Sequence, residues 1–185
     1  VQGPGVPILL VHSASNPFGL YTIEILRAQG FNEFLAMDIS EVTSTILNNY
    51  DVVILGECTV DAGFVTDITV WVDAGGVLVA FRPDPQLSGL LGLTAAAGTL
   101  SEGYLLVNTA SEPGTGIVDE TIQFHGDSDY YTLNGATSLA TLYSDATTPT
   151  AYPAVTQNLV GSNNGKACAF TYDLAKSVVL TRQGN

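Results

Sequence analysis

The sequence predicts an α/β fold: a flavodoxin-like doubly wound parallel sheet, in the order 2-1-3-4-5, with an antiparallel β-rich insertion in its second half. Through the first half, short apolar runs alternate with segments of helical periodicity, as they do in βαβ units. The apolar runs are continuous, which is typical of strands buried on both faces. After about residue 93 the segments become short and rich in Thr and Tyr, with Gly, Asn, Asp and Pro between them. That change indicates antiparallel strands and turns.

The first half is expected to contain four strand–helix units with right-handed crossovers. The first strand, Val6–Val11, precedes a helix that Asn16 and Pro17 begin and Gly30 ends. Asn caps helices, Pro suits the first helical position, and Gly suits the residue after the last turn. The other three units are expected as strand 34–39 with a short helix to 47, strand 51–56 with a helix to Gly75, and strand 77–81 with a helical turn at 86–91.

The second half is expected to leave the parallel sheet and then return to it. Residues 94–98 are interpreted as a small-residue loop, and strands are predicted at 104–107, 121–124, 137–143 and 154–159. The turn at 161–166 leads into an apolar strand, Ala167–Tyr172, which we assign to the main sheet. Residues 1–185 therefore form one domain, and residues 94–160 are a β-rich insertion within it.

Composition limits the classes of partner. Hydrophobic residues make up 46% of the 185 residues and charged residues 12%, and the net charge is −13 from 18 acids and five bases. No basic surface is available for nucleic acid or for an anionic membrane, and no apolar run is long enough to span a bilayer. Abundant Thr, Ser, Asn and Gly favour an extracellular or cell-surface location in bacteria. The chain opens at VQGPGVP with no signal peptide, so we expect a mature or trimmed fragment.

Three segments carry a resemblance to a known superfamily: YDVVILGE (50–57), WVDAGGVLVAFRPD (71–84) and PAVTQNLVGSNNGKACAFTYDL (153–174). They resemble class I glutamine amidotransferase-like proteins, in the non-catalytic branch near trehalose-utilisation-protein-like and β-galactosidase trimerisation-like domains. The resemblance covers residues 6–93 and 153–174. The end of the chain, AFTYDLAKSVVLTRQGN, also looks like a module of large bacterial surface proteins. The resemblance implies other domains of the same polypeptide, or a carbohydrate, as partners, and it implies self-association.

The catalytic residues of that superfamily are missing. Active members carry a Cys at the turn after the strand that Val77–Phe81 matches, whereas this chain has Phe81, Arg82 and Pro83 at that turn. Active members also carry a His-x-Glu pair further along the chain. It has no counterpart here, because the two histidines, His12 and His125, both lie outside the C-terminal strand region. The leading hypothesis is therefore a non-catalytic structural or interaction module of a larger secreted protein.

Ligands of open parallel sheets bind outside the carboxyl ends of the strands. Such a rim would contain Ser13, Asn16, Arg82, Asp84 and Asp173. Arg82 either clamps a substrate carboxylate through its guanidinium fork or makes a structural ion pair with Glu57, Asp84 or Asp173.

Two other functions stay open. One is a hydrolase of a small amide, ester or glycan that uses His12, Glu57 and Cys58, because a nearby imidazolium favours the thiolate. Ser13 and Ser15 lack a nucleophile elbow. The other is a sugar-binding module, whose groove would be lined by the tyrosines of the second half, or whose tyrosines would simply pack in strands: Tyr104, Tyr130, Tyr131, Tyr143 and Tyr152.

No cofactor or metal is indicated. HSASNP follows the first strand and lacks the glycines of a dinucleotide site. Asp127 and Asp129 are weak metal candidates, since Ca²⁺ takes six to eight oxygens and the D-x-D of HGDSD supplies few. A turn stabilised by the aspartate side chains is the favoured interpretation of this segment. Cys58 and Cys168 are interpreted as small buried hydrophobes or as a disulfide.

Overall fold

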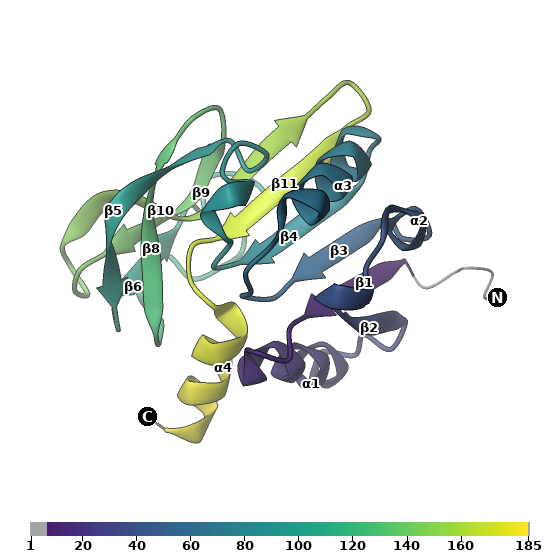
Figure 1. The fold of residues 1–185 in the computed structure, drawn as a ribbon. Coiled ribbons are helices and arrows are strands. Elements are labelled where there is room, and N and C mark those ends of the chain that lie inside the picture. The colour runs from purple at the N-terminus through teal and green to yellow at the C-terminus, as the bar shows by residue number, and fades with distance from the viewer. Residues whose placement is uncertain (1–6, 185) are drawn as a thin grey trace.

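A computed structural model describes residues 7–184. Five parallel strands run in the order β2-β1-β3-β4-β11 (Figure 1). The first strand ends one residue later than expected, at His12, while Val6, its expected start, lies outside the described residues. The bounds of the five are β1 (Ile8–His12), β2 (Phe34–Asp38), β3 (Val52–Leu55), β4 (Val77–Phe81) and β11 (Gly165–Phe170).

The helices begin at capping residues that the sequence displays. Asn16 accepts a hydrogen bond from Phe18, Thr43 from Ile46, and Asp61 from Phe64, as N-caps do. The helical turn expected at 86–91 is present as a 3₁₀ turn at Pro85–Leu87. The helical elements are η1 (Pro17–Leu20), α1 (Tyr21–Ala28), η2 (Ile39–Glu41), α2 (Ser44–Leu47), α3 (Ala62–Asp73), η3 (Pro85–Leu87) and α4 (Leu174–Gln183). None of the helices in residues 7–184 is long and apolar enough to cross a membrane.

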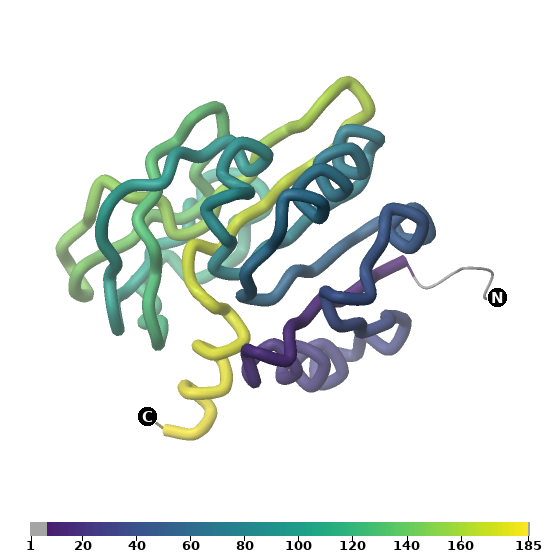
Figure 2. The backbone as a smooth tube through the Cα atoms, viewed as in Figure 1, coloured from purple at the N-terminus to yellow at the C-terminus, as the bar shows by residue number. Residues whose placement is uncertain are grey.

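The last helix, α4, is not among the elements that the sequence analysis predicts. Asp173 caps it by accepting a hydrogen bond from the Lys176 amide. Figure 2 shows this C-terminal segment beside the first helical segment of the chain, and α4 contacts both η1 and α1. The last helix therefore lies beside η1 and α1, at the carboxyl edge of the parallel strands.

Most strands of the second half extend the main sheet. β10 pairs antiparallel with β11, and β9, β6 and β7 follow it outward, which makes a sheet of nine strands within residues 7–184. Their bounds are β6 (Tyr104–Val107), β7 (Ile122–Gln123), β9 (Thr137–Tyr143) and β10 (Pro149–Val160).

Two further strands correct the sequence analysis. Residues 94–98, expected as a loop, belong to β5 (Leu93–Ser101), and residues 127–129, expected as a turn, begin β8 (Asp127–Leu133). The two strands pair antiparallel as a separate two-stranded sheet, with an irregularity between Ala95 and Thr99. Several side chains of β5 are small and exposed. Because they are not buried on one face, the sequence of β5 lacks the alternation of apolar and polar residues that predicts a strand.

The core consists of two clusters. The larger lies against the parallel strands and includes Leu9, Val53, Ile68 and Leu78, all without exposed area. The smaller lies in the antiparallel region, where the rings of Phe124 and Tyr172 stack with centroids 4.9 Å apart. The larger cluster also contains Leu93, Tyr131 and Ala136 from the second half, so apolar packing as well as polar contacts at the strand ends joins the parallel and antiparallel regions.

Candidate functional site

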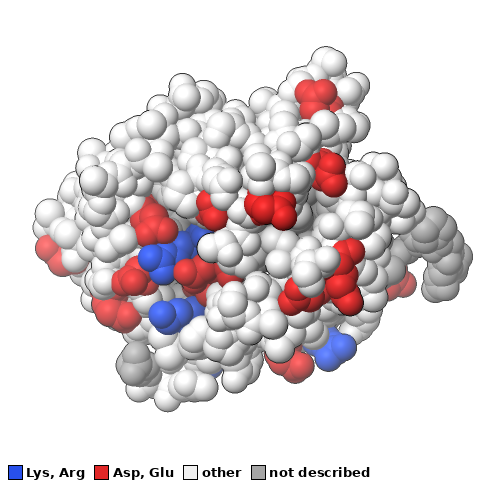
Figure 3. Space-filling model, in the orientation of Figure 1, with Lys and Arg blue, Asp and Glu red and all other residues white. Residues whose placement is uncertain are grey.

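A cleft of about 530 Å³ opens at the carboxyl ends of β1, β3 and β4. Three loops line it, at 15–18, 57–59 and 82–85, together with Asp129 from β8 and Lys176 from α4. Figure 3 shows basic side chains surrounded by acidic ones in a hollow of this face. The cleft therefore lies where the fold class places ligands, and the second half of the chain forms one of its walls.

Arg82 occupies the turn directly after β4 with an unusual backbone. Its φ is +40°, in the left-handed region that residues with a Cβ seldom adopt. Its N–H donates to the carbonyls of Phe170 and Tyr172, at 2.8 and 3.1 Å. The neighbouring strand thus stabilises the strained turn.

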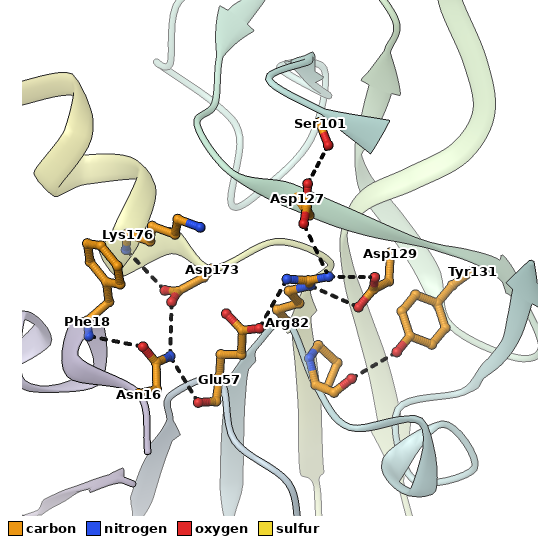
Figure 4. A network of polar contacts seen from close by, with 11 residues as sticks. Asn16, Phe18, Glu57, Arg82, Ser101, Asp127, Asp129, Tyr131, Asp173 and Lys176 are labelled. Atoms are coloured by element: carbon orange, nitrogen blue, oxygen red, sulfur yellow. Dashed lines mark hydrogen bonds and ion pairs between the residues drawn. The ribbon is translucent and has the colours of Figure 1, made fainter. Parts of the chain in front are cut away.

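The Arg82 guanidinium is bound by carboxylates on two sides (Figure 4). Nε and Nη2 donate to the two oxygens of Asp129, at 3.0 and 3.1 Å, and Nη1 donates to Glu57 at 3.1 Å. Asp127 lies 3.8 Å from Nη2. Of the three expected partners only Glu57 binds Arg82 in the described structure, because β8 brings two aspartates to the guanidinium from the second half.

The carboxylates of Asp84 and Asp173 accept hydrogen bonds from backbone N–H groups. The carboxylate of Asp84 accepts from the N–H groups of Val60 and Gln86, at 3.2 and 2.9 Å. Asp173 is 3% exposed and caps α4. It also accepts from the side-chain amide of Asn16 at 3.3 Å, and the same amide donates to the Glu57 carbonyl at 3.0 Å. Asn16 therefore ties the ends of β1 and β3 to the last helix.

Glu57 has a perturbed acidity. Burial raises the pKa of its carboxyl, and the nearby Asp173 raises it further, while the positive charge of Arg82 opposes the change. Both causes that raise the pKa are the usual ones for a partly desolvated acid beside a second acid. Glu57 therefore holds a proton at a higher pH than an exposed glutamate.

Cys58 is a weak nucleophile in this setting. Burial, followed by the charges of Asp84, Asp38 and Glu57, raises the pKa of its thiol to about 12, and the reactive form of cysteine is the thiolate. Cys58 lines the cleft but His12 is not among the lining residues. His12 Nδ1 instead lies 4.0 Å from Asp38 Oδ2. Within residues 7–184 no hydrogen bond joins Cys58 to His12, whereas the hydrolase hypothesis requires a thiol–imidazole pair.

The remaining candidates lie elsewhere or are already engaged. Ser13 and Ser15 share a hydrogen bond of 2.8 Å between their hydroxyls. Asp127 and Asp129, the candidate metal ligands, both face Arg82, so a guanidinium stands where a metal would have to bind. Cys168 is, like Cys58, a free thiol.

The tyrosines of the second half pack mainly against protein. Tyr131 is 1% exposed and its hydroxyl donates to the Pro83 carbonyl at 2.9 Å, and burial raises its pKa to about 12. Tyr130 stacks on Tyr152 with centroids 4.1 Å apart. The Tyr131 contact, which the sequence analysis missed, fixes the loop after Arg82 to β8.

Lys176 and Phe18 are cleft residues that the sequence analysis also missed. The Lys176 ammonium lies 5.6 Å from the centre of the Phe18 ring, within the range of a cation–π contact. Phe18 stands in the segment that Asn16 and Pro17 mark, but nothing local indicates that a lysine 158 positions later would reach it.

Comparisons with known proteins support the fold and go no further. No family model and no curated protein matches the chain. Among solved structures, a β-galactosidase from Bacillus circulans sp. alkalophilus is similar over 96% of this chain and 31% of its own, with 15% identity and a TM-score of 0.68. The exo-β-1,4-mannosidase Op5Man5 from Opitutaceae bacterium strain TAV5 is similar over 96% and 33%, with 16% identity and a TM-score of 0.67.

A ThuA-like protein from Bacteroides uniformis matches over 94% of this chain and 84% of its own, with 11% identity and a TM-score of 0.66. This chain spans about a third of the length of the two glycosidases. These three neighbours are two glycosidases and a ThuA-like protein, which agrees with the domain types that the sequence resembles. At these identities the likeness concerns the fold alone.

Proposed function

We propose that the chain is a flavodoxin-like, amidotransferase-like module without catalytic activity, acting as a structural or interaction unit of a larger, carbohydrate-related bacterial protein. One observation carries the proposal. The position after β4 keeps the strained backbone of a nucleophile turn, with φ +40°, but its side chain is an arginine bound by Glu57 and Asp129. Strained residues of this kind often serve function, and here the residue joins the two halves of the chain.

The second support is the lack of an activated nucleophile among the described residues of the cleft. The Cys58 thiol has its pKa raised to about 12, and the Ser15 hydroxyl is bonded to Ser13. Without a nucleophile or a general base beside one, a covalent mechanism has no starting point.

The larger protein, its bacterial surface location and self-association are part of the same proposal. The larger protein is supported by solved glycosidases in which this fold occupies about a third of the chain. The location and self-association are proposed from the composition of the chain and from the resemblance of its sequence. We expect the full gene product to contain a glycoside-cleaving domain beside residues 1–185, and the purified product to self-associate in light-scattering measurements. A full-length product that holds no second domain would remove this part of the proposal.

The absence of catalysis is tested with chromogenic glycosides, esters and amides. We expect the chain to release no product above the rate in buffer. The matched variants are Cys58→Ala and Glu57→Gln, which remove the thiol and the perturbed acid of the cleft. Turnover by the unaltered chain that either variant abolishes would show an active site and contradict the proposal.

A further inference from the structure

The strand-end cleft contains one cationic group whose hydrogen-bonding capacity is unused. In residues 7–184 the Lys176 ammonium has no carboxylate within ion-pair distance and no hydrogen-bond acceptor, although the chain carries 18 acids and five bases. Figure 4 shows its side chain reaching from α4 into the space between Asp173 and Asp127. An ammonium has three donors, and this one faces the cleft without a hydrogen-bond partner in residues 7–184, so its donors are available to a ligand.

The carboxylates of the cleft, in contrast to Lys176, already have hydrogen-bond partners. Both oxygens of Asp129 are held by Arg82, and both oxygens of Asp84 are held by backbone N–H groups. A cationic ligand would therefore find few free acceptors, and it would meet Arg82 and Lys176. An anionic ligand could use Lys176 but would have to approach three carboxylates, those of Glu57, Asp84 and Asp129. The charges favour a neutral ligand.

The apolar residues that line the cleft restrict the class of ligand further. The Phe18 ring and three prolines, Pro17, Pro83 and Pro85, stand among the charged residues of the cleft. A sugar ring presents hydroxyls, which both donate and accept, at its edge and C–H groups on its faces. The volume of about 530 Å³ lies within the range of roughly 300–1,000 Å³ for small-molecule sites.

We infer that this cleft binds a neutral sugar ring, with the Lys176 ammonium donating to its hydroxyls and the Phe18 ring packing against its C–H face. The inference rests on the proposed function, because it gives a ligand class to the cleft of the same non-catalytic module. The rigid network around Arg82 would form the opposite wall, already ordered before the ligand arrives.

The experiment is an NMR titration of the ¹⁵N-labelled chain with galactose and mannose. Galacturonate and galactosamine, which have the same ring with a carboxylate or an ammonium, are the charge controls. We expect the neutral sugars to shift amides in segments 15–18 and 57–59 and near Lys176, and the charged sugars to bind about tenfold more weakly. Lys176→Met should weaken binding by about tenfold, and Lys166→Met, at the chain's other lysine, should leave it unchanged.

Three results would overturn the inference: no shift at the cleft with either neutral sugar, tighter binding of galacturonate, or equal binding by Lys176→Met. Phe18→Leu provides a second variant, which should also weaken binding, and thermal unfolding of each variant verifies that it is folded. Binding and turnover are measured separately. A failed titration therefore leaves the non-catalytic proposal standing, and turnover of a chromogenic substrate would refute that proposal without deciding sugar binding.

Discussion

Arg82 and Asp129 are joined by two parallel hydrogen bonds, from Nε to Oδ2 at 3.0 Å and from Nη2 to Oδ1 at 3.1 Å. Arg82 follows β4 of the parallel sheet, whereas Asp129 lies in β8 of the two-stranded sheet. A guanidinium fork on a carboxylate is stronger and more directional than a single neutral hydrogen bond. The pair therefore sets the position of the second half of the chain against the strand ends.

Replacing Arg82 should destabilise the protein. In Arg82→Met the carboxylates of Glu57 and Asp129 lose their partner in a partly buried place, so we expect the free energy of unfolding to fall by about 3 kcal/mol. Urea denaturation measures it. The control is Arg27→Met, because the Arg27 side chain is 62% exposed and pairs with Glu24 on the helix surface, and such pairs contribute less than about 1 kcal/mol. Equal losses in the two variants would show that the Arg82 network has no special role.

The backbone at Arg82 makes a separate prediction. Because φ is +40° there, a Cβ is strained, and we expect Arg82→Gly to be more stable than Arg82→Ala by about 1 kcal/mol. Both variants lack the guanidinium, so their difference isolates the backbone. Thermal unfolding of the two proteins compares them. A more stable alanine variant would contradict a left-handed conformation at this turn.

The Cys58 thiol should resist alkylation in the folded protein. Its pKa is raised to about 12, whereas an unfolded cysteine has a pKa near 8.5, so the thiolate is scarce at neutral pH. In a Cys168→Ala background, which leaves one thiol, iodoacetamide should label the chain slowly at neutral pH and quickly in urea. Mass spectrometry follows the reaction. Rapid labelling without urea would indicate an activated thiol and revive the hydrolase hypothesis.

Glu57 should make stability depend on pH. Its folded pKa is raised, so the folded state holds the proton more tightly than the unfolded state. The stabilisation from that proton is complete below the unfolded pKa of about 4.3 and is lost as the pH rises through the folded pKa. Glu57→Gln should remove this component. The measured quantity is the unfolding free energy of the unaltered chain minus that of the variant. It should fall as the pH rises from about 4 to about 7.

Glu102 and Asp38 also make the stability of the protein depend on pH, so the effect of Glu57 is measured as the difference between the unaltered chain and Glu57→Gln. Hydrogen bonds from backbone N–H groups are the largest cause that lowers the pKa of each carboxyl, and lowered pKa values make stability fall as the pH falls. Both proteins carry these two groups, so their effects cancel. A difference that does not vary with pH would contradict the raised pKa of Glu57.

Local patterns predicted the strands and helix starts of the first half well. Val77–Phe81 is continuously apolar because both faces of this strand are covered, and none of its five residues is exposed. Asp61 begins α3 because its carboxylate caps the first turn. The pattern failed at β5, whose exposed, small side chains carry no periodicity. It also failed at α4, where the only clear marker is the cap Asp173.

The candidate site divides in the same way. The sequence alone determined that the turn after the fourth strand carries Arg82 and has no cysteine. It also determined that Asn16, Glu57 and Asp84 follow neighbouring strands. Only the tertiary structure decided that Asp129 and Lys176 complete the cleft and that Tyr131 holds the loop behind Arg82. Periodicity reports the burial of a residue within its own element, whereas these contacts depend on how β8 and α4 pack against strand ends tens of residues away.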